Sequence, residues 1–231
     1  MTAMNAFNMI DGIDGLLGGL SLVAFLGVAF LAVLHFQPVP LLIALIMIAA
    51  LLVFLAYNLG SVALGLRKIF MGDGGSMFIG MLVVCLLALM TLSGPQTNFE
   101  GALDIEMINE RPTPVRPVAV LWLIAIPIMD MFGTMARRIV KRESPFKPDR
   151  DHLHHIFMRA GFSSAETLVV ITLSGVLLVL FGLVLEILRV PEPVVALLYI
   201  GVFVVYAFGL RRVWRIVAMV RLLRRLDEAR E

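Results

Sequence analysis

The chain has 231 residues, of which 60% are hydrophobic and 16% charged, and its mean hydropathy is +0.97. A soluble domain of this size could not bury so much apolar surface, which excludes a soluble enzyme. The even hydrophobic runs lack the alternation of a membrane β-barrel, so the sequence predicts an all-α, polytopic helical membrane protein. A net charge of +2 gives no sign of a nucleic-acid partner.

In chain order, the first fifteen residues contain two aspartates and no Lys or Arg. A signal peptide needs a basic start, so we expect these residues to belong inside a folded site. Six apolar segments follow, each long enough to cross a bilayer, and we interpret residues 1–231 as a single membrane domain. The predicted spans are 16–36, 39–57, 77–93, 118–136, 167–188 and 193–210.

The basic residues are distributed unevenly between the loops that connect these spans. Loops 58–76 and 137–166 and the tail 211–231 hold 16 of the 19 Lys and Arg, and the other side holds Arg111, Arg116 and Arg189. The positive-inside rule then places both chain ends in the cytoplasm, with six transmembrane helices. The basic tail is expected to lie on anionic membrane lipids.

Three polar clusters fall on the cytoplasmic side of this topology: residues 8–15, Gly72-Asp73-Gly74-Gly75-Ser76, and 149–155, which carries three of the four histidines. Asn8, Asp11 and Asp14 recur every three residues, which predicts that they lie on one side of a helical turn. An Asp-Gly pair also serves as a plain turn or helix cap, and that alternative stays open for each acidic cluster. Loop 137–166 is interpreted as a cytoplasmic histidine loop.

The chemistry of these clusters points to a metal and an anion. Carboxylates brought together repel one another and raise their own pKa values unless a cation lies among them, and oxygen ligands suit Mg²⁺ or Mn²⁺. Zinc on His152, His154 and His155 is an alternative, but Arg150 and Arg159 indicate an anion-binding loop. An acidic metal site beside a basic loop is typical of phosphoryl transfer from a diphosphate, and a site at a bilayer surface favours a lipid acceptor.

Three ordered motifs, NAFNMIDGIDGLLGG, FMGDGGS and SPFKPDRDHLHHIFMRAGF, resemble the bacterial polyprenyl-phosphate N-acetylhexosamine-1-phosphate transferases. The histidine pattern HLHH favours the N-acetylglucosamine branch of that family. The resemblance implies transfer of N-acetylglucosamine 1-phosphate from UDP-N-acetylglucosamine to undecaprenyl phosphate with release of UMP, the initiating step of O-antigen or related cell-envelope polysaccharide synthesis. It also implies a multi-pass protein of the bacterial inner membrane with a cytoplasmic active site, and it is compatible with a homodimer or with another UDP-N-acetylhexosamine.

The resemblance assigns roles to individual residues. Asn8 and Asp73 match positions that hold Mg²⁺, and Asp14 and Phe70 match positions that contact and stack on uracil. Asp11 belongs to the same acidic motif as Asn8, and Asp11 and Asp14 are expected to be catalytic. The positions that match the catalytic, diphosphate-binding and sugar-binding loop are His152, His154 and His155. Arg138 and Arg150 are expected to bind substrate phosphate, although Arg138 also fits an ordinary membrane anchor.

One feature of the family is absent from this sequence. The family carries an aspartate-rich DDxxD motif upstream of NAFN, so we expect this chain to be the carboxyl-terminal part of a longer transferase and to lack activity by itself. A different class of function is a cation transporter with Asp11, Asp14, Asp73 and Asp130 as pathway residues. Asp130 lies within the fourth predicted span, where a partner in helix packing is favoured slightly over a substrate contact.

Overall fold

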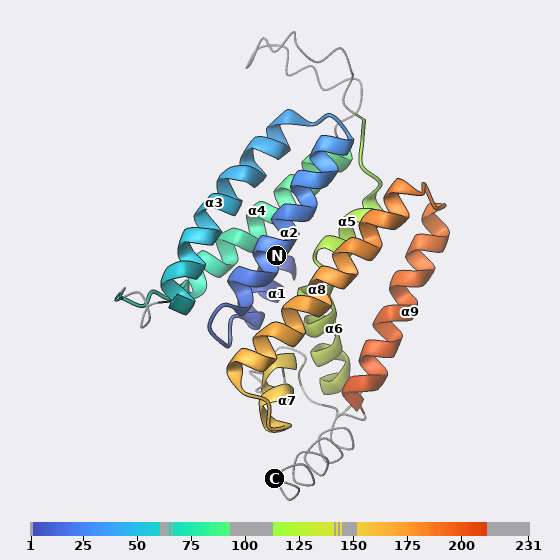
Figure 1. The fold of residues 1–231 in the computed structure, drawn as a ribbon. Helices are drawn as coiled ribbons and strands as arrows, with labels where there is room; N and C mark the ends of the chain where they lie inside the picture. The colour runs from blue at the N-terminus through green and yellow to red at the C-terminus, as the bar shows by residue number, and fades with distance from the viewer. Residues whose placement is uncertain are drawn as a thin grey trace, which may run out of the picture.

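The computed structural model describes residues 2–60, 65, 67–92, 113–140, 142, 144 and 152–211, with the side chains of residues 210 and 211 left aside. Within these residues every regular element is a helix and none is a strand, which confirms the predicted all-α class. Figure 1 shows long helices running side by side. They are α1 (Thr2–Ile10), α2 (Leu16–Leu34), α3 (Pro38–Gly60), α4 (Gly72–Leu92), α5 (Pro117–Leu123), α6 (Ala125–Val140), α7 (Leu153–Arg159), α8 (Ser164–Ile187) and α9 (Glu192–Arg211).

Five of the six predicted spans correspond to single helices long and apolar enough to cross a membrane, namely α2, α3, α4, α8 and α9. The fourth, predicted over 118–136, is instead broken at Ile124 into α5 and α6, which are bent by 84°. Pro127 explains the break, because it lacks an N–H and its ring would collide with the carbonyl of Leu123 in a continuous helix. Counted as one span, the bent pair gives six crossings.

Helix α2 lies at the centre of the bundle and packs against α3, α4, α5 and α8. Phe25, Val28 and Leu31 of α2 have no exposed surface. By contrast, only 17% of the apolar span of α3 and 6% of that of α9 is buried. These outer helices are apolar on all sides, as expected of helices that face lipid.

Helix α1 was not predicted as a separate element. It packs against α4 and α6, with Ala6, Phe7 and Ile10 buried. A side chain at Gly80 of α4 would place its Cβ 2.9 Å from the Cα of Met4, so the close contact between α1 and α4 requires glycine there. Figure 1 shows the start of α1 about midway along the bundle. The expectation that the first residues belong inside a folded structure is therefore confirmed.

At the end of the bundle opposite the loop between α1 and α2, polar side chains form what we call the far-end network: His35, Gln37, Thr113, Arg116 and Glu186. Glu186 is 6% exposed; its Oε2 pairs with Arg116 Nη2 at 2.7 Å, and its Oε1 lies 3.3 Å from His35 Nε2. Gln37 donates to the carbonyls of Met90 and Thr113. The network joins the ends of α2, α4 and α8 to the starts of α3 and α5.

Replacing Glu186 by glutamine is expected to destabilise the bundle strongly. The amide cannot balance the charge of Arg116, and breaking a buried ion pair by removing one partner costs about 3–5 kcal/mol. Thermal unfolding in detergent should show a much lower midpoint for Glu186→Gln. Glu192→Gln, at the exposed first turn of α9, is the matched control and should leave the midpoint unchanged. Equal midpoints for the two variants would contradict this role of the network.

Candidate active site

The loop Asp11–Gly15 joins α1 to α2, and we call it the acid loop. The N–H of Gly12 donates to the carbonyl of Ile10 at 2.8 Å, and Gly15 has φ 77°, a left-handed conformation that favours glycine. The chain therefore turns here instead of continuing as a helix. Asn8 lies on α1 whereas Asp11 and Asp14 lie in the loop, so the prediction that the three share one side of a helical turn is wrong.

Asn58, near the end of α3, connects the acid loop to the segment before α4. Its Oδ1 accepts from the N–H of Gly15 at 2.7 Å, and its Nδ2 donates to the carbonyl of Ile69 at 2.8 Å. The side chain is 6% exposed. The sequence analysis missed this residue, although an asparagine that directly follows an apolar span was a usable signal. Asn58 thus fixes the distance between two chain segments that share a pocket.

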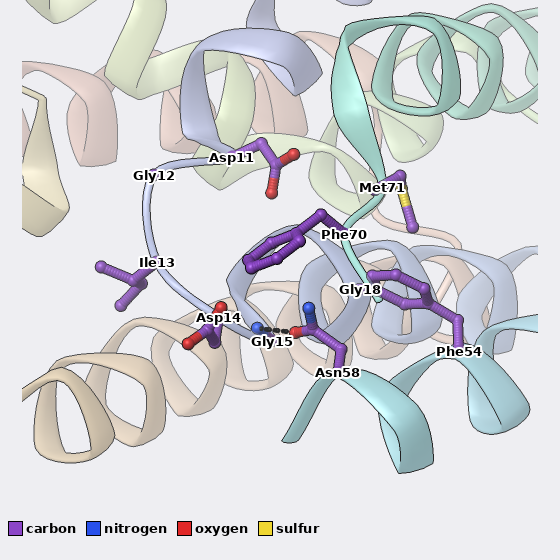
Figure 2. A pocket seen from close by; sticks show the side chains of 10 residues that line it. All are labelled: Asp11, Gly12, Ile13, Asp14, Gly15, Gly18, Phe54, Asn58, Phe70 and Met71. Atoms are coloured by element: carbon purple, nitrogen blue, oxygen red, sulfur yellow. Dashed lines mark hydrogen bonds between the residues drawn. The ribbon is translucent and has the colours of Figure 1, made fainter. Parts of the chain in front are cut away.

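Figure 2 shows this pocket, which has a volume of about 160 Å³. The acid loop curves along one side, and Phe70, which is 74% exposed, lies opposite. Lys68 Nζ is 2.5 Å from Asp14 Oδ2 and 5.0 Å from the centre of the Phe70 ring. The pocket therefore offers an aromatic face, a carboxylate and a cation together. The residues that line it are Asp11, Gly12, Ile13, Asp14, Gly15, Gly18, Phe54, Asn58, Phe70 and Met71.

The first turn of α4 meets α1 beside this pocket. Ser76 Oγ donates to Asn8 Oδ1 at 2.5 Å and also contacts the carbonyl of Asp73 at 2.9 Å. Burial raises the pKa of Asp11, and the nearby charges of Asp73 and Asp14 raise it further. Asn8, Asp11, Asp14 and Asp73, predicted to converge from two separate motifs, are therefore neighbours in the fold.

The chemistry of these side chains indicates which metal ion they could bind. The donors are carboxylate and amide oxygens, which suit a hard divalent cation. Among the described residues no group of three His, Cys, Asp or Glu side chains could hold one ion. Mg²⁺ commonly binds through one or two carboxylates, with water and substrate phosphate completing its shell. The residues fit such an open site, whereas a structural zinc site with four protein ligands has no counterpart in this part of the chain.

Helix α7 brings His154 onto the acid loop. The ring is 2% exposed, and a Cβ built on Gly12 would lie 1.9 Å from its Nε2. Neither ring nitrogen has a hydrogen-bond partner among the residues that the structure describes. Burial, with a smaller contribution from His155, lowers the pKa of His154 to about 4. The ring is therefore uncharged at neutral pH.

The other predicted basic residues are His152, His155, Arg138 and Arg150. His152 is buried, and its Nδ1 lies 3.0 Å from Asp130 Oδ2. The ring of His155 lies 4.1 Å, centre to centre, from that of His154. Arg138 is buried in the last turn of α6. Arg150 lies outside the described residues.

The low pKa of His154 predicts how stability depends on pH. The unfolded chain binds a proton near pH 6.5, whereas the folded chain does so only near pH 4, so acidification between these values favours unfolding. The thermal midpoint should fall as the pH is lowered from about 6.5 to about 4. Above pH 6.5, His154 should contribute no pH dependence. His154→Gln should make the fall shallower, which differential scanning fluorimetry can measure. Identical slopes for both proteins would show that the ring titrates normally.

Asn58→Ala is expected to weaken binding in the pocket. Loss of two buried hydrogen bonds, each worth about 1 kcal/mol, should raise the KM of a pocket ligand roughly tenfold while changing kcat less. Steady-state kinetics with the nucleotide-sugar donor proposed below can measure both constants. Tyr57→Phe, at the exposed neighbouring position, is the control. An unchanged KM would mean that Asn58 does not shape the pocket.

Known proteins resemble this chain in sequence. Residues 1–91, which contain the acid loop and Asp73, match the profile described as glycosyl transferase family 4. No solved structure matches the chain.

Curated relatives match nearly the whole chain. The undecaprenyl-phosphate alpha-N-acetylglucosaminyl 1-phosphate transferase of Escherichia coli (strain K12) is 41% identical over 225 residues, covering 96% of this chain and 56% of the relative. The proteins of the same name from Yersinia pestis and Pasteurella multocida are 42% and 38% identical, covering 96% and 89% of this chain and 56% and 53% of the relatives. The chain thus spans about half the length of these relatives.

Proposed function

Because residues 1–91 match the glycosyl transferase family 4 profile and the relatives named above are about 40% identical, we propose that this protein transfers N-acetylglucosamine 1-phosphate from UDP-N-acetylglucosamine to undecaprenyl phosphate. A phosphate oxygen of the lipid forms a bond to the β-phosphorus of the donor, the bond from that phosphorus to the α-phosphate oxygen breaks, and UMP leaves. The observation that carries the proposal is the contact between two separate motifs: the ring of His154 lies against Gly12 of the acid loop.

The pocket beside the acid loop suits the uridine of the donor. The exposed face of Phe70 offers a stacking surface for uracil. Lys68 donates to Oδ2 of Asp14, and a carboxylate has a second oxygen, Oδ1, that can accept the N–H of uracil. Asn58 holds both sides of this pocket at a fixed distance.

Asn8 and Asp73 are proposed to hold Mg²⁺, for which Mn²⁺ could substitute, with Asp11 beside them. Burial is the main cause of the raised pKa of Asp11, but the carboxylates of Asp73 and Asp14 add repulsion that a bound cation would relieve, which supports this assignment. When bound, the ion would offset the charge of the donor diphosphate. Ser76 orients the Asn8 amide by donating to its oxygen, which leaves the second lone pair of that oxygen as a ligand.

The histidines act on the diphosphate from the other side of the acid loop. His154 is neutral and can donate one hydrogen bond to a phosphate oxygen as charge builds on the leaving UMP. His155 adjoins it on α7. The buried ring of His154 packs against one side of the acid loop at Gly12, whereas Asp11 and Asp14 stay exposed to substrate.

The site is proposed to face the cytoplasm from the bacterial inner membrane. The acid loop, the segment before α4 and α7 all lie at one end of the bundle, as their contacts through Asn58 and Gly12 require. In the topology predicted from the sequence, this is the side of the membrane whose loops and tail hold 16 of the 19 Lys and Arg. UDP-sugars are cytoplasmic, and the lipid acceptor reaches such a site from the bilayer. Nothing in the described residues identifies a homodimer contact.

The transporter alternative receives no support. Transport predicts carboxylates facing one another near the middle of the membrane. Asp11 and Asp14 lie instead in a loop at the end of the bundle, and Asp130 is bonded to His152 and Leu153 at the start of α7.

The proposal is tested by supplying undecaprenyl phosphate and Mg²⁺ to membranes that contain the full-length transferase, this chain with its upstream DDxxD segment, from a host whose own transferase is deleted. UDP-N-acetylglucosamine and UDP-N-acetylgalactosamine are given in parallel, and lipid products are identified by mass spectrometry. Undecaprenyl diphosphate N-acetylglucosamine is the expected product. Product from UDP-N-acetylgalactosamine only would show that the proposed sugar is wrong. No lipid-linked sugar from either donor would overturn the proposal.

A further inference from the structure

Asp130 is the point at which three elements meet. It lies in α6 and is 2% exposed. Its Oδ1 accepts from the N–H of Leu153 at 3.0 Å and from the hydroxyl of Tyr206 at 2.9 Å, and its Oδ2 lies 3.0 Å from His152 Nδ1. One buried carboxylate thus joins α6 to the start of α7 and to α9.

The carboxylate also decides the tautomer of His152. An ionised carboxylate only accepts hydrogen bonds, so Nδ1 of His152 must carry the proton that bridges to Oδ2. Because the backbone N–H of Leu153 is bonded to the same carboxylate, both the ring and the backbone at the start of α7 are fixed relative to α6.

This fixed point is close to the site. His154 follows Leu153 directly, and its ring occupies the space above Gly12 with no hydrogen bond of its own among the described residues. Packing and the anchoring of α7 must therefore determine where the ring lies. Tyr206 belongs to α9, the last span, most of which is exposed. Its hydroxyl donates to Asp130, so α9 is connected to the start of α7 through this one hydrogen bond and the carboxylate.

We infer that Asp130 is a positioning residue that holds the start of α7 so that His154 lies over the acid loop, with Tyr206 bracing it from α9. The inference rests on the proposed function for its catalytic consequence, though its structural consequence is independent of activity. A displacement of about 1 Å in a positioned group can lower turnover about 100-fold. Asp130→Asn should therefore lower kcat by about that factor, and Tyr206→Phe, which removes one of three contacts, by roughly fivefold.

The structural consequence is tested by modifying histidines with diethyl pyrocarbonate in the full chain and locating the adducts by mass spectrometry. His154 should be protected in the unsubstituted protein and should react at least about tenfold faster in Asp130→Asn, because burial limits access to the ring. His35, in the far-end network, is the internal control for folding and should react at one rate in all variants. Tyr199→Phe, on the same helix but with no hydrogen bond to its hydroxyl in the described residues, should match the unsubstituted protein.

The catalytic consequence is tested by measuring turnover and donor binding separately. Asp130→Asn should lower kcat while the Kd for UDP-N-acetylglucosamine changes by less than about twofold, and combining it with His152→Ala should add little to the worse single effect. Continued protection of His154 in Asp130→Asn would overturn the inference. A parallel loss of donor binding, thermal stability and His35 protection would show a merely structural role. Absence of turnover in the unsubstituted protein, with His154 still released by Asp130→Asn, would reject the proposed function alone.

Discussion

Asp73→Asn is expected to abolish release of UMP while leaving the protein folded. Asp73 lies in the first turn of α4, and its negative charge helps to raise the pKa of Asp11 in the acid loop. Removing it takes away a proposed ligand of Mg²⁺, and the charge stabilisation that a metal supplies is worth several kcal/mol in the transition state. Since each 1.36 kcal/mol changes the rate tenfold, the loss should be about 100-fold or more. A coupled assay for UMP under saturating Mg²⁺ measures it.

The control for this substitution is Glu192→Gln, the same acid-to-amide change at an exposed position at the other end of the bundle. It should turn over normally. The Asp73→Asn protein should also keep its thermal midpoint, because removal of one of several repelling carboxylates does not destabilise the fold. Turnover near that of the control would refute the metal role of Asp73.

Gly12→Ala is expected to produce the second large loss of activity. The added Cβ would lie 1.9 Å from His154 Nε2 and 2.3 Å from Cε1, which is far inside van der Waals contact. The ring is buried, so it can relieve the collision only by leaving its place over the acid loop or by displacing the loop itself. Either movement separates the histidine from the carboxylates, and we expect kcat to fall about 100-fold.

Gly201→Ala on α9, where a Cβ would meet nothing within 4 Å, tests whether adding a methyl group is harmful in itself. That variant should behave as the unsubstituted protein. Histidine modification should in addition show His154 more reactive in Gly12→Ala. Full activity with His154 still protected would mean that the ring does not occupy this position in the working protein.

Most of the fold was predictable because the lipid bilayer imposes simple rules on sequence. Runs of about 20 apolar residues give spans, and five predicted segments correspond to single helices. The break at Ile124 was not predicted, although Pro127, which causes it, lies within the predicted span. Helix α1 was missed because its nine residues are too few for a span, and only packing against α4 and α6 stabilises it.

The candidate site was predictable in its membership but not in its geometry. Asp11, Asp14 and Asp73 stood out because their two clusters fall on the same side of the predicted topology as the histidine cluster. Their period of three suggested a helical turn, yet the left-handed Gly15 makes a loop. Asn58 and Tyr206 gave weaker signals, because one polar group beside or inside an apolar helix does not reveal its partner. Those partners lie 43 and 76 residues away and follow only from the fold.

The central claim is that the protein moves a sugar together with one phosphate. UDP-N-acetylglucosamine carrying ³²P only at the β-phosphorus, given with undecaprenyl phosphate and Mg²⁺ to membranes that contain the full-length transferase, tests it most directly. The account predicts that the label appears in the lipid fraction as undecaprenyl diphosphate N-acetylglucosamine, while the released nucleotide is unlabelled UMP. Label that leaves in UDP, with unlabelled phosphate in the glycolipid, would show transfer of the sugar alone and would contradict the account.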